Sequence, residues 1–142
     1  MTPTDTLCTM GRAALFALVV VLAACSKPTL PGDLEVADIT TGRELAPDGG
    51  IKEDARTNMF WATDTFYVSV RTNGSAQNVT MTARWSGPEN AKAEVSKTLS
   101  PKGPTTTTLE APPPNGRWPA GDYTVEILVN GGSQGIRELN AR

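Results

Sequence analysis

Hydrophobic and polar residues alternate along three stretches of the chain. In "TFYVSVRT" every second residue is apolar, namely Phe66, Val68 and Val70, and the residues between them are more polar. The three stretches are 65–72, 78–85 and 122–129. A period of two directs alternate side chains to opposite faces of a β-strand, so one face of each strand can be buried. Because a shift of one residue would turn each apolar set outward, the register of these strands is well defined.

Further strands and turns complete this pattern. Asn-Gly pairs follow two of the strands, at Asn73-Gly74 and Asn130-Gly131, and these residues tolerate the positive φ of tight hairpins. Three consecutive prolines at 112–114 end another strand, since they lack amide hydrogens. No stretch of the folded part has a convincing helical period. The additional strands are expected at 34–41, 92–99, 104–111 and 133–140. About seven strands predict an all-β fold, an antiparallel sandwich of two packed sheets.

The composition is consistent with one domain and argues against nucleic acid as a partner. The chain of 142 residues is long enough for a single core, since domains commonly have about 100 to 150 residues. Thirteen glycines and eleven prolines fit a fold with many turns. The 13 basic and 15 acidic residues are scattered, so no basic patch indicates binding of nucleic acid.

The first 24 residues are typical of a targeting segment. An uninterrupted apolar run covers 13–25, which is shorter than the roughly 20 residues that a membrane-spanning helix requires. Arg12 precedes the run and small residues end it, as in a secretory signal peptide. The leader before Met10 has no basic residue, so translation could start at Met1 or at Met10. In either case we expect residues 1–24 to be removed.

The run ends in "LAAC", 22–25, which resembles the lipobox of bacterial lipoprotein signal peptides. The resemblance implies that the thiol of Cys25 receives a diacylglyceryl group, that the signal is cut before Cys25, and that the new amine is acylated, commonly with palmitate. Ser26 follows, which resembles the class sorted to the outer membrane. We therefore expect residues 25–32 to be a lipidated cysteine and a short tether, with the protein in the bacterial cell envelope, facing the periplasm.

Other roles for Cys25 are less consistent with the sequence. A catalytic thiolate needs a neighbouring cation such as histidine to lower its pKa, and the chain has no histidine. A disulfide to Cys8 would close no loop in the folded domain.

The stretch "WPAGDYTVEILVNG", 118–131, resembles the penultimate strand and hairpin of immunoglobulin-like and fibronectin-type-III-like sandwiches. Tyr123 stands where those folds have a corner tyrosine, and Trp85 where they have a core tryptophan. The resemblance implies such a domain over residues 33–142. The bridging cysteines of antibody domains are absent. Apolar residues stand in their places: Val68 or Val70, and Val125.

Candidate catalytic and metal-binding groups are few. Asp48, Glu53 and Asp54 could offer oxygens to calcium, but their spacing is not that of an EF-hand and the ligands are too few. An Asp-Gly-Gly turn with solvated charges is the favoured interpretation. As a glycosidase pair, Glu53 and Asp54 are disfavoured because adjacent residues of a strand face opposite ways. We predict no metal, no cofactor and no enzymatic activity.

Two segments are candidates for binding a partner. In "NMFWATD" the residues Met59, Phe60 and Trp61 are consecutive and cannot all point inward. Phe60 could close the end of the sandwich and leave Trp61 partly exposed, or Trp61 could be a contact residue of an interface. The second candidate is an edge strand to which a partner could add a strand. Its residues are Thr105, Thr106, Thr107 and Thr108.

These expectations together favour a noncatalytic, lipid-anchored envelope protein. Its sandwich would bind another protein or an envelope polymer near the membrane. The alternative is a periplasmic enzyme inhibitor or immunity protein. A small cell-wall hydrolase would depend on Glu53 and Asp54, the one carboxylate pair that the sequence offers.

Overall fold

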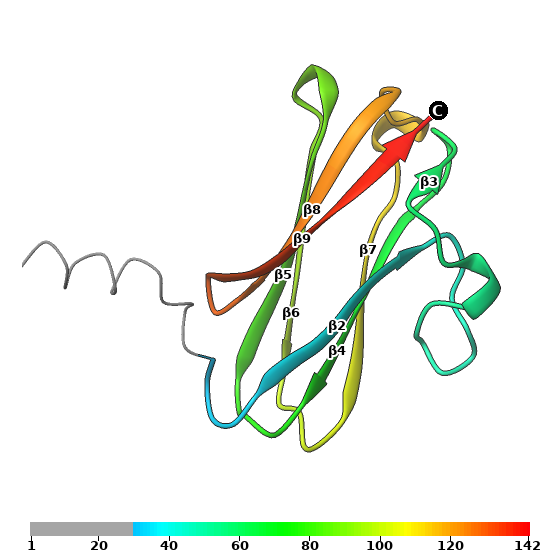
Figure 1. Cartoon of the computed structure of the whole chain (residues 1–142). Coiled ribbons are helices and arrows are strands. Elements are labelled where there is room, and N and C mark those ends of the chain that lie inside the picture. The colour runs from blue at the N-terminus through cyan, green and yellow to red at the C-terminus, as the bar shows by residue number, and fades with distance from the viewer. Residues whose placement is uncertain (1–29) are drawn as a thin grey trace, which may run out of the picture.

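The computed structural model describes residues 30–142, which form a sandwich of two β-sheets (Figure 1). One sheet has three strands in the order β2-β4-β7, and the other has five in the order β3-β9-β8-β5-β6. Neighbouring strands are antiparallel except for β3 and β9, which are parallel. The strands are β2 (Glu35–Gly42), β3 (Met59–Phe60), β4 (Phe66–Asn73), β5 (Val79–Ser86), β6 (Lys92–Leu99), β7 (Thr105–Ala111), β8 (Gly121–Val129) and β9 (Gly132–Ala141).

The predicted all-β sandwich is confirmed, and each of the seven predicted strands is present. The two-residue strand β3 is an addition. Three short 3-10 turns, η1 (Glu53–Ala55), η2 (Pro88–Asn90) and η3 (Pro114–Gly116), are the helical elements of residues 30–142. Within that range no helix is long and apolar enough to cross a membrane. Cys25, the lipobox-like sequence at 22–25 and the expected cleavage site lie outside the described residues.

The core lies between the two sheets, where the alternating apolar residues meet. Phe66, Val68 and Val70 of β4 are fully buried, as are their counterparts on β5 and β8. At one end of the core, Phe66 stacks on Trp118 with ring centroids 4.2 Å apart. Tyr123 meets both rings edge-on. Trp118 therefore packs in the core between Phe66 and Tyr123.

Two residues expected on outer faces are buried. Leu128 is buried on the outer face of β8, beside a bulge at which β9 has one unpaired residue, Gln134. Ser69 of β4 is buried on the outer face of the three-stranded sheet. The segment 43–57 folds over that face, and Thr108 on β7 donates a hydrogen bond to the carbonyl of Gly49 at 2.6 Å.

One predicted hairpin is confirmed and the other is wrong. Asn130 and Gly131 both have positive φ, 50° and 85°, and connect β8 to β9 in a type I′ turn. Asn73-Gly74 makes no tight hairpin, because β4 and β5 belong to different sheets and the chain must cross between them. Gly74 is still required there, since its φ is 88° and a Cβ would collide with the carbonyl of Asp33.

Each edge of the three-stranded sheet is covered by a long cationic side chain from the larger sheet. Lys97 on β6 donates from Nζ to the carbonyl of Thr108 on β7 at 2.6 Å. Arg137 on β9 donates from Nε to the carbonyl of Ile39 on β2 at 3.1 Å. These contacts occupy carbonyl groups that an added strand would use.

The beginning of the described chain and strand β3 lie toward opposite ends of the sandwich (Figure 1). Leu30 packs against the core, and Asp33 hydrogen-bonds Ser75 just beyond the end of β4. Phe60 contacts Phe66 at the start of β4. The eight residues of β4 separate these ends by roughly 25 Å, at about 3.3 Å per residue.

Candidate functional site

The most prominent exposed apolar group lies around Trp61, at the β3 end of the sandwich. Met59 is 40% exposed and Trp61 is 53% exposed, while Phe60 between them is buried. These two residues line a hollow of about 340 Å³ together with Arg43, Thr57 and Arg142. We call these five residues the Trp61 surface. Phe60 closes the end of the core and Trp61 is exposed, an arrangement compatible with both roles considered for Trp61 in the sequence.

Asp64 fixes the turn that carries Trp61. One oxygen of its carboxylate, Oδ2, accepts the backbone N–H of Trp61 at 2.8 Å and the Nε–H of Arg43 at 2.9 Å. The carbonyl of Asp64 accepts the indole N–H of Trp118 at 3.0 Å. The turn is thereby connected to the buried aromatic cluster, so the backbone of Trp61 is held in one place.

Two guanidinium groups lie over the indole ring of Trp61. The Cζ atom of Arg43 is 6.0 Å from the ring centroid and that of Arg142 is 5.8 Å from it. The backbone of Arg142 is itself fixed, because its N–H donates to Phe60 and its carbonyl accepts from Ala62. Each cation–π contact at an exposed site contributes about 0.5 to 1 kcal/mol. The ring is therefore both accessible and restrained.

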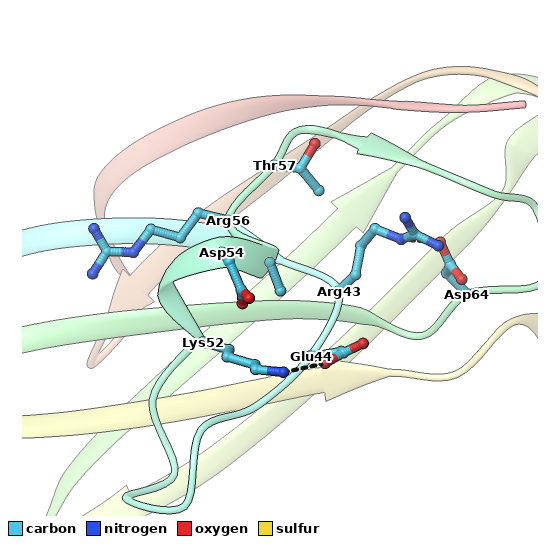
Figure 2. Close-up of a pocket in the computed structure, with 8 residues that line it drawn as sticks. Arg43, Glu44, Lys52, Asp54, Arg56, Thr57 and Asp64 are labelled. Atoms are coloured by element: carbon cyan, nitrogen blue, oxygen red, sulfur yellow. Dashed lines mark hydrogen bonds and ion pairs between the residues drawn. The ribbon is translucent and has the colours of Figure 1, made fainter.

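A second hollow, of about 360 Å³, adjoins the Trp61 surface and shares Arg43 and Thr57 with it (Figure 2). Its charges are largely paired, by Arg43 with Asp64 and by Lys52 with Glu44 at 3.2 Å. The hydrogen bond to Glu44, followed by the negative charges of Asp54 and Glu44, raises the pKa of Lys52 and keeps it protonated. In Figure 2 Arg56 directs its guanidinium away from the Arg43–Asp64 pair.

The three candidate acidic residues do not gather at one place, since Asp48 and Glu53 line one hollow and Asp54 lines another. Asp48-Gly49-Gly50 forms the predicted turn: Gly49 has φ of 89° and the N–H of Gly50 donates to Asp48 Oδ1. Glu53 and Asp54 lie in η1 rather than in a strand, so the reason given for their divergence is wrong. They nevertheless line different hollows. Within residues 30–142 no three acidic, cysteine or histidine side chains gather as a metal site.

The threonine strand lies at a sheet edge, as expected, because β7 pairs only with β4. Its side chains do not form one surface. Thr106 is exposed, Thr107 is buried, and Thr105 and Thr108 are half-buried. Thr108 is engaged through its hydroxyl with Gly49 and through its carbonyl with Lys97. A partner-binding role for Thr105, Thr106, Thr107 and Thr108 stays a prediction.

Comparison with known proteins adds no assignment, since no protein-family model and no curated protein matches the chain.

The sequence did not predict a role at the Trp61 surface for three residues, Asp64, Arg43 and Arg142. Asp64 follows Trp61 by three residues, a spacing at which a carboxylate can accept backbone N–H groups of a turn, so it had a local signal. No local feature of the sequence indicates that Arg43 and Arg142 lie beside Trp61. They reach Trp61 through the pairing of β3 with β9 and through the return of segment 43–57, which are contacts between distant parts of the chain.

Proposed function

We propose that this protein is a noncatalytic, lipid-anchored protein of the bacterial envelope, whose immunoglobulin-like domain binds a protein or an envelope polymer through the Trp61 surface. The lipid anchor rests on the sequence "LAAC" ending at Cys25. Outer-membrane sorting with the domain in the periplasm rests on Ser26. The binding role rests on the described domain.

The observation that carries the binding role is a half-exposed tryptophan on a fixed backbone. Exposing an indole ring to water is unfavourable. The other aromatic residues at this end of the domain, such as Phe60 and Trp118, are buried in the core, whereas Trp61 is not. Tryptophan, methionine and arginine are enriched at protein interfaces, and tryptophan and arginine at their strongest contacts. A restrained side chain also loses little conformational entropy when a partner binds.

Two structural features support the immunoglobulin-like assignment. The hydroxyl of Tyr123 donates to the carbonyl of Pro119 at 2.6 Å, four residues upstream, as a corner tyrosine does. Val125, and either Val68 or Val70, stand where disulfide-bridged members of the family have cysteines, and all three valines are fully buried. Burial of apolar surface thus replaces the bridge.

The position of the Trp61 surface suits an anchored protein. A chain attached to a membrane before Leu30 would enter the domain at the end opposite Trp61. The Trp61 surface would then point away from that membrane. The β7 edge is the less favourable alternative, because Lys97 and Gly49 already occupy polar groups of Thr108.

A photocrosslinking residue at position 59 or 61 of the full-length protein tests this proposal in living cells. Ile136 provides a matched control, since it is 54% exposed on β9 and apolar but does not line the Trp61 surface. We expect a discrete crosslinked product from positions 59 and 61 and none from position 136. Equal labelling from all three positions, or none, contradicts the proposed face.

The same experiment distinguishes the alternative function. A stoichiometric product with a single hydrolase, and loss of that hydrolase's activity on binding, would support a periplasmic inhibitor or immunity protein. A structural protein or polymer in the product would support the envelope-binding role.

A further inference from the structure

Resting on the proposed binding function, we infer that the partner presents an acidic peptide segment, and that carboxylates of this segment bind Arg43 and Arg142 beside Trp61. The occupant is thus a protein chain rich in Asp or Glu at the contact. The inference follows from the charge of the Trp61 surface, the hydrogen-bonding groups left free there, and the two guanidiniums beside the indole ring.

The Trp61 surface is cationic on a chain that is acidic overall. It contains two arginines, and Asp64 beside it neutralises one of them, whereas the whole chain has a formal net charge of −2. Charge complementarity selects partners and accelerates their encounter. A basic spot with an exposed tryptophan at its centre therefore favours an acidic partner.

Both guanidiniums have donors available. Arg43 uses Nε for Asp64, and within the described residues its Nη groups make no hydrogen bond. No side-chain hydrogen bond or ion pair of Arg142 occurs among residues 30–142. A guanidinium can bind a carboxylate through two parallel N–H groups. Two carboxylates of one peptide could each find such a donor pair.

A peptide suits this site better than an acidic polysaccharide. A sugar ring stacking on the indole would have to compete with Arg43 and Arg142, whose Cζ atoms lie 6.0 and 5.8 Å from the ring centroid. Among the five residues of the Trp61 surface, only Thr57 has an uncharged polar side chain. One hydroxyl group offers few hydrogen bonds for recognising the many hydroxyl groups of a polysaccharide. Exposed Met59 offers a polarizable contact for peptide side chains.

The test uses full-length protein in detergent micelles and hexaglutamate as the probe. Trp85 and Trp118 are buried, so the indole N–H signal of Trp61 in an NMR spectrum reports on this surface, and Trp61→Phe identifies it. We expect a saturable shift of that signal with a Kd of about 1 mM, and none with hexaglutamine at equal ionic strength.

Substitution of the arginines should weaken this binding. We expect Arg142→Gln to raise the Kd about fivefold and Arg43→Gln with Arg142→Gln to raise it about tenfold or more. The control is Lys92→Gln with Lys102→Gln, which removes the same charge from exposed positions outside the Trp61 surface and should leave the Kd within twofold.

The remaining outcomes overturn the inference. Absence of a saturable shift, or an equal loss of affinity in the lysine control, would remove the acidic-peptide site. Binding of oligogalacturonate without binding of hexaglutamate would reassign the site to an acidic polysaccharide. Crosslinking from positions 59 and 61 in cells that is unchanged by both arginine substitutions would leave the proposed function intact while contradicting this inference.

Discussion

Tyr123 and Asp64 each stabilise the β3 end of the molecule through side-chain hydrogen bonds. The hydroxyl of Tyr123 reaches the carbonyl of Pro119, and its ring lies so close to Gly87 that a Cβ there would collide with it. Burial raises the pKa of Tyr123, and the negative charge of Glu89 acts in the same direction. The neutral phenol is therefore the form that the folded state favours.

Replacing Tyr123 by Phe should lower the free energy of unfolding at pH 7 by about 1 kcal/mol, since one partly buried hydrogen bond to the carbonyl of Pro119 is lost. Because the folded pKa lies above the unfolded value near 10, the contribution of the phenol is complete below pH 10 and decreases as pH rises further. Urea unfolding of both proteins between pH 7 and pH 11 measures this. The difference between them should shrink above pH 10, and parallel curves would contradict the assignment.

Replacing Asp64 by Ala should lower the free energy of unfolding by about 1 to 2 kcal/mol, because the N–H of Trp61 and the guanidinium of Arg43 lose their acceptor. The indole of Trp61 should also become more accessible to acrylamide quenching. Asp54→Ala is the control, since Asp54 lines the adjacent hollow and accepts no side-chain hydrogen bond within the described residues. Its effect should stay within about 0.5 kcal/mol.

At the scale of elements, the three-stranded sheet has two edges at which a further strand could pair. Both of its outer strands, β2 and β7, have unpaired sides, and a long cationic side chain covers a carbonyl on each. Lysine and arginine at sheet edges oppose the addition of further strands, since a strand from another chain would have to displace the cation.

The double substitution Lys97→Val with Arg137→Val should therefore promote concentration-dependent self-association of the protein. Analytical ultracentrifugation over about a hundredfold range of concentration would detect it. Lys102→Val with Arg117→Val changes the charge equally at loop positions and should leave the protein in its original state. Identical behaviour of the two double variants would mean that charge alone, rather than edge cover, controls association.

The sequence predicts the strands well because three of them have a local alternating pattern and turn residues, such as the Asn-Gly pairs and the three prolines at 112–114, delimit others. Strand β3 has only two residues and pairs with β9 about eighty residues later, so no local pattern predicts it. Leu128 is buried although the alternation of β8 places it on the outer face, and the burial of Ser69 depends on segment 43–57. The exposure of Trp61 follows from its neighbours in sequence, but its two arginines come from contacts between distant segments.

At the scale of the whole molecule, the sandwich separates two regions with different proposed roles. Leu30 enters the core at one end, and the Trp61 surface occupies the other. The resemblance of residues 22–25 to a lipobox places the expected anchor only a few residues before Leu30. Membrane attachment and partner binding would thus occur at opposite ends of one rigid domain.

Replacing Cys25 by Ser should prevent lipidation and either release the protein from membranes or leave an unprocessed precursor. Two or three acyl chains make membrane attachment stable, and the serine variant would have none. Fractionation of cells followed by mass measurement of the N-terminal peptide checks this. Cys8→Ser should behave as the original protein, and full membrane retention of a processed Cys25→Ser variant would contradict the anchor.

The opposite placement of Leu30 and Trp61 has a mechanical consequence. A load applied between these two residues would act nearly along the strands, because β2 and β4 run between the two ends. Hydrogen bonds of an antiparallel pair lie perpendicular to the strands, so such a load shears the register from Glu35 to Gly42 as a unit instead of opening one bond after another. Tension applied between the two ends would thus meet many hydrogen bonds loaded together in shear.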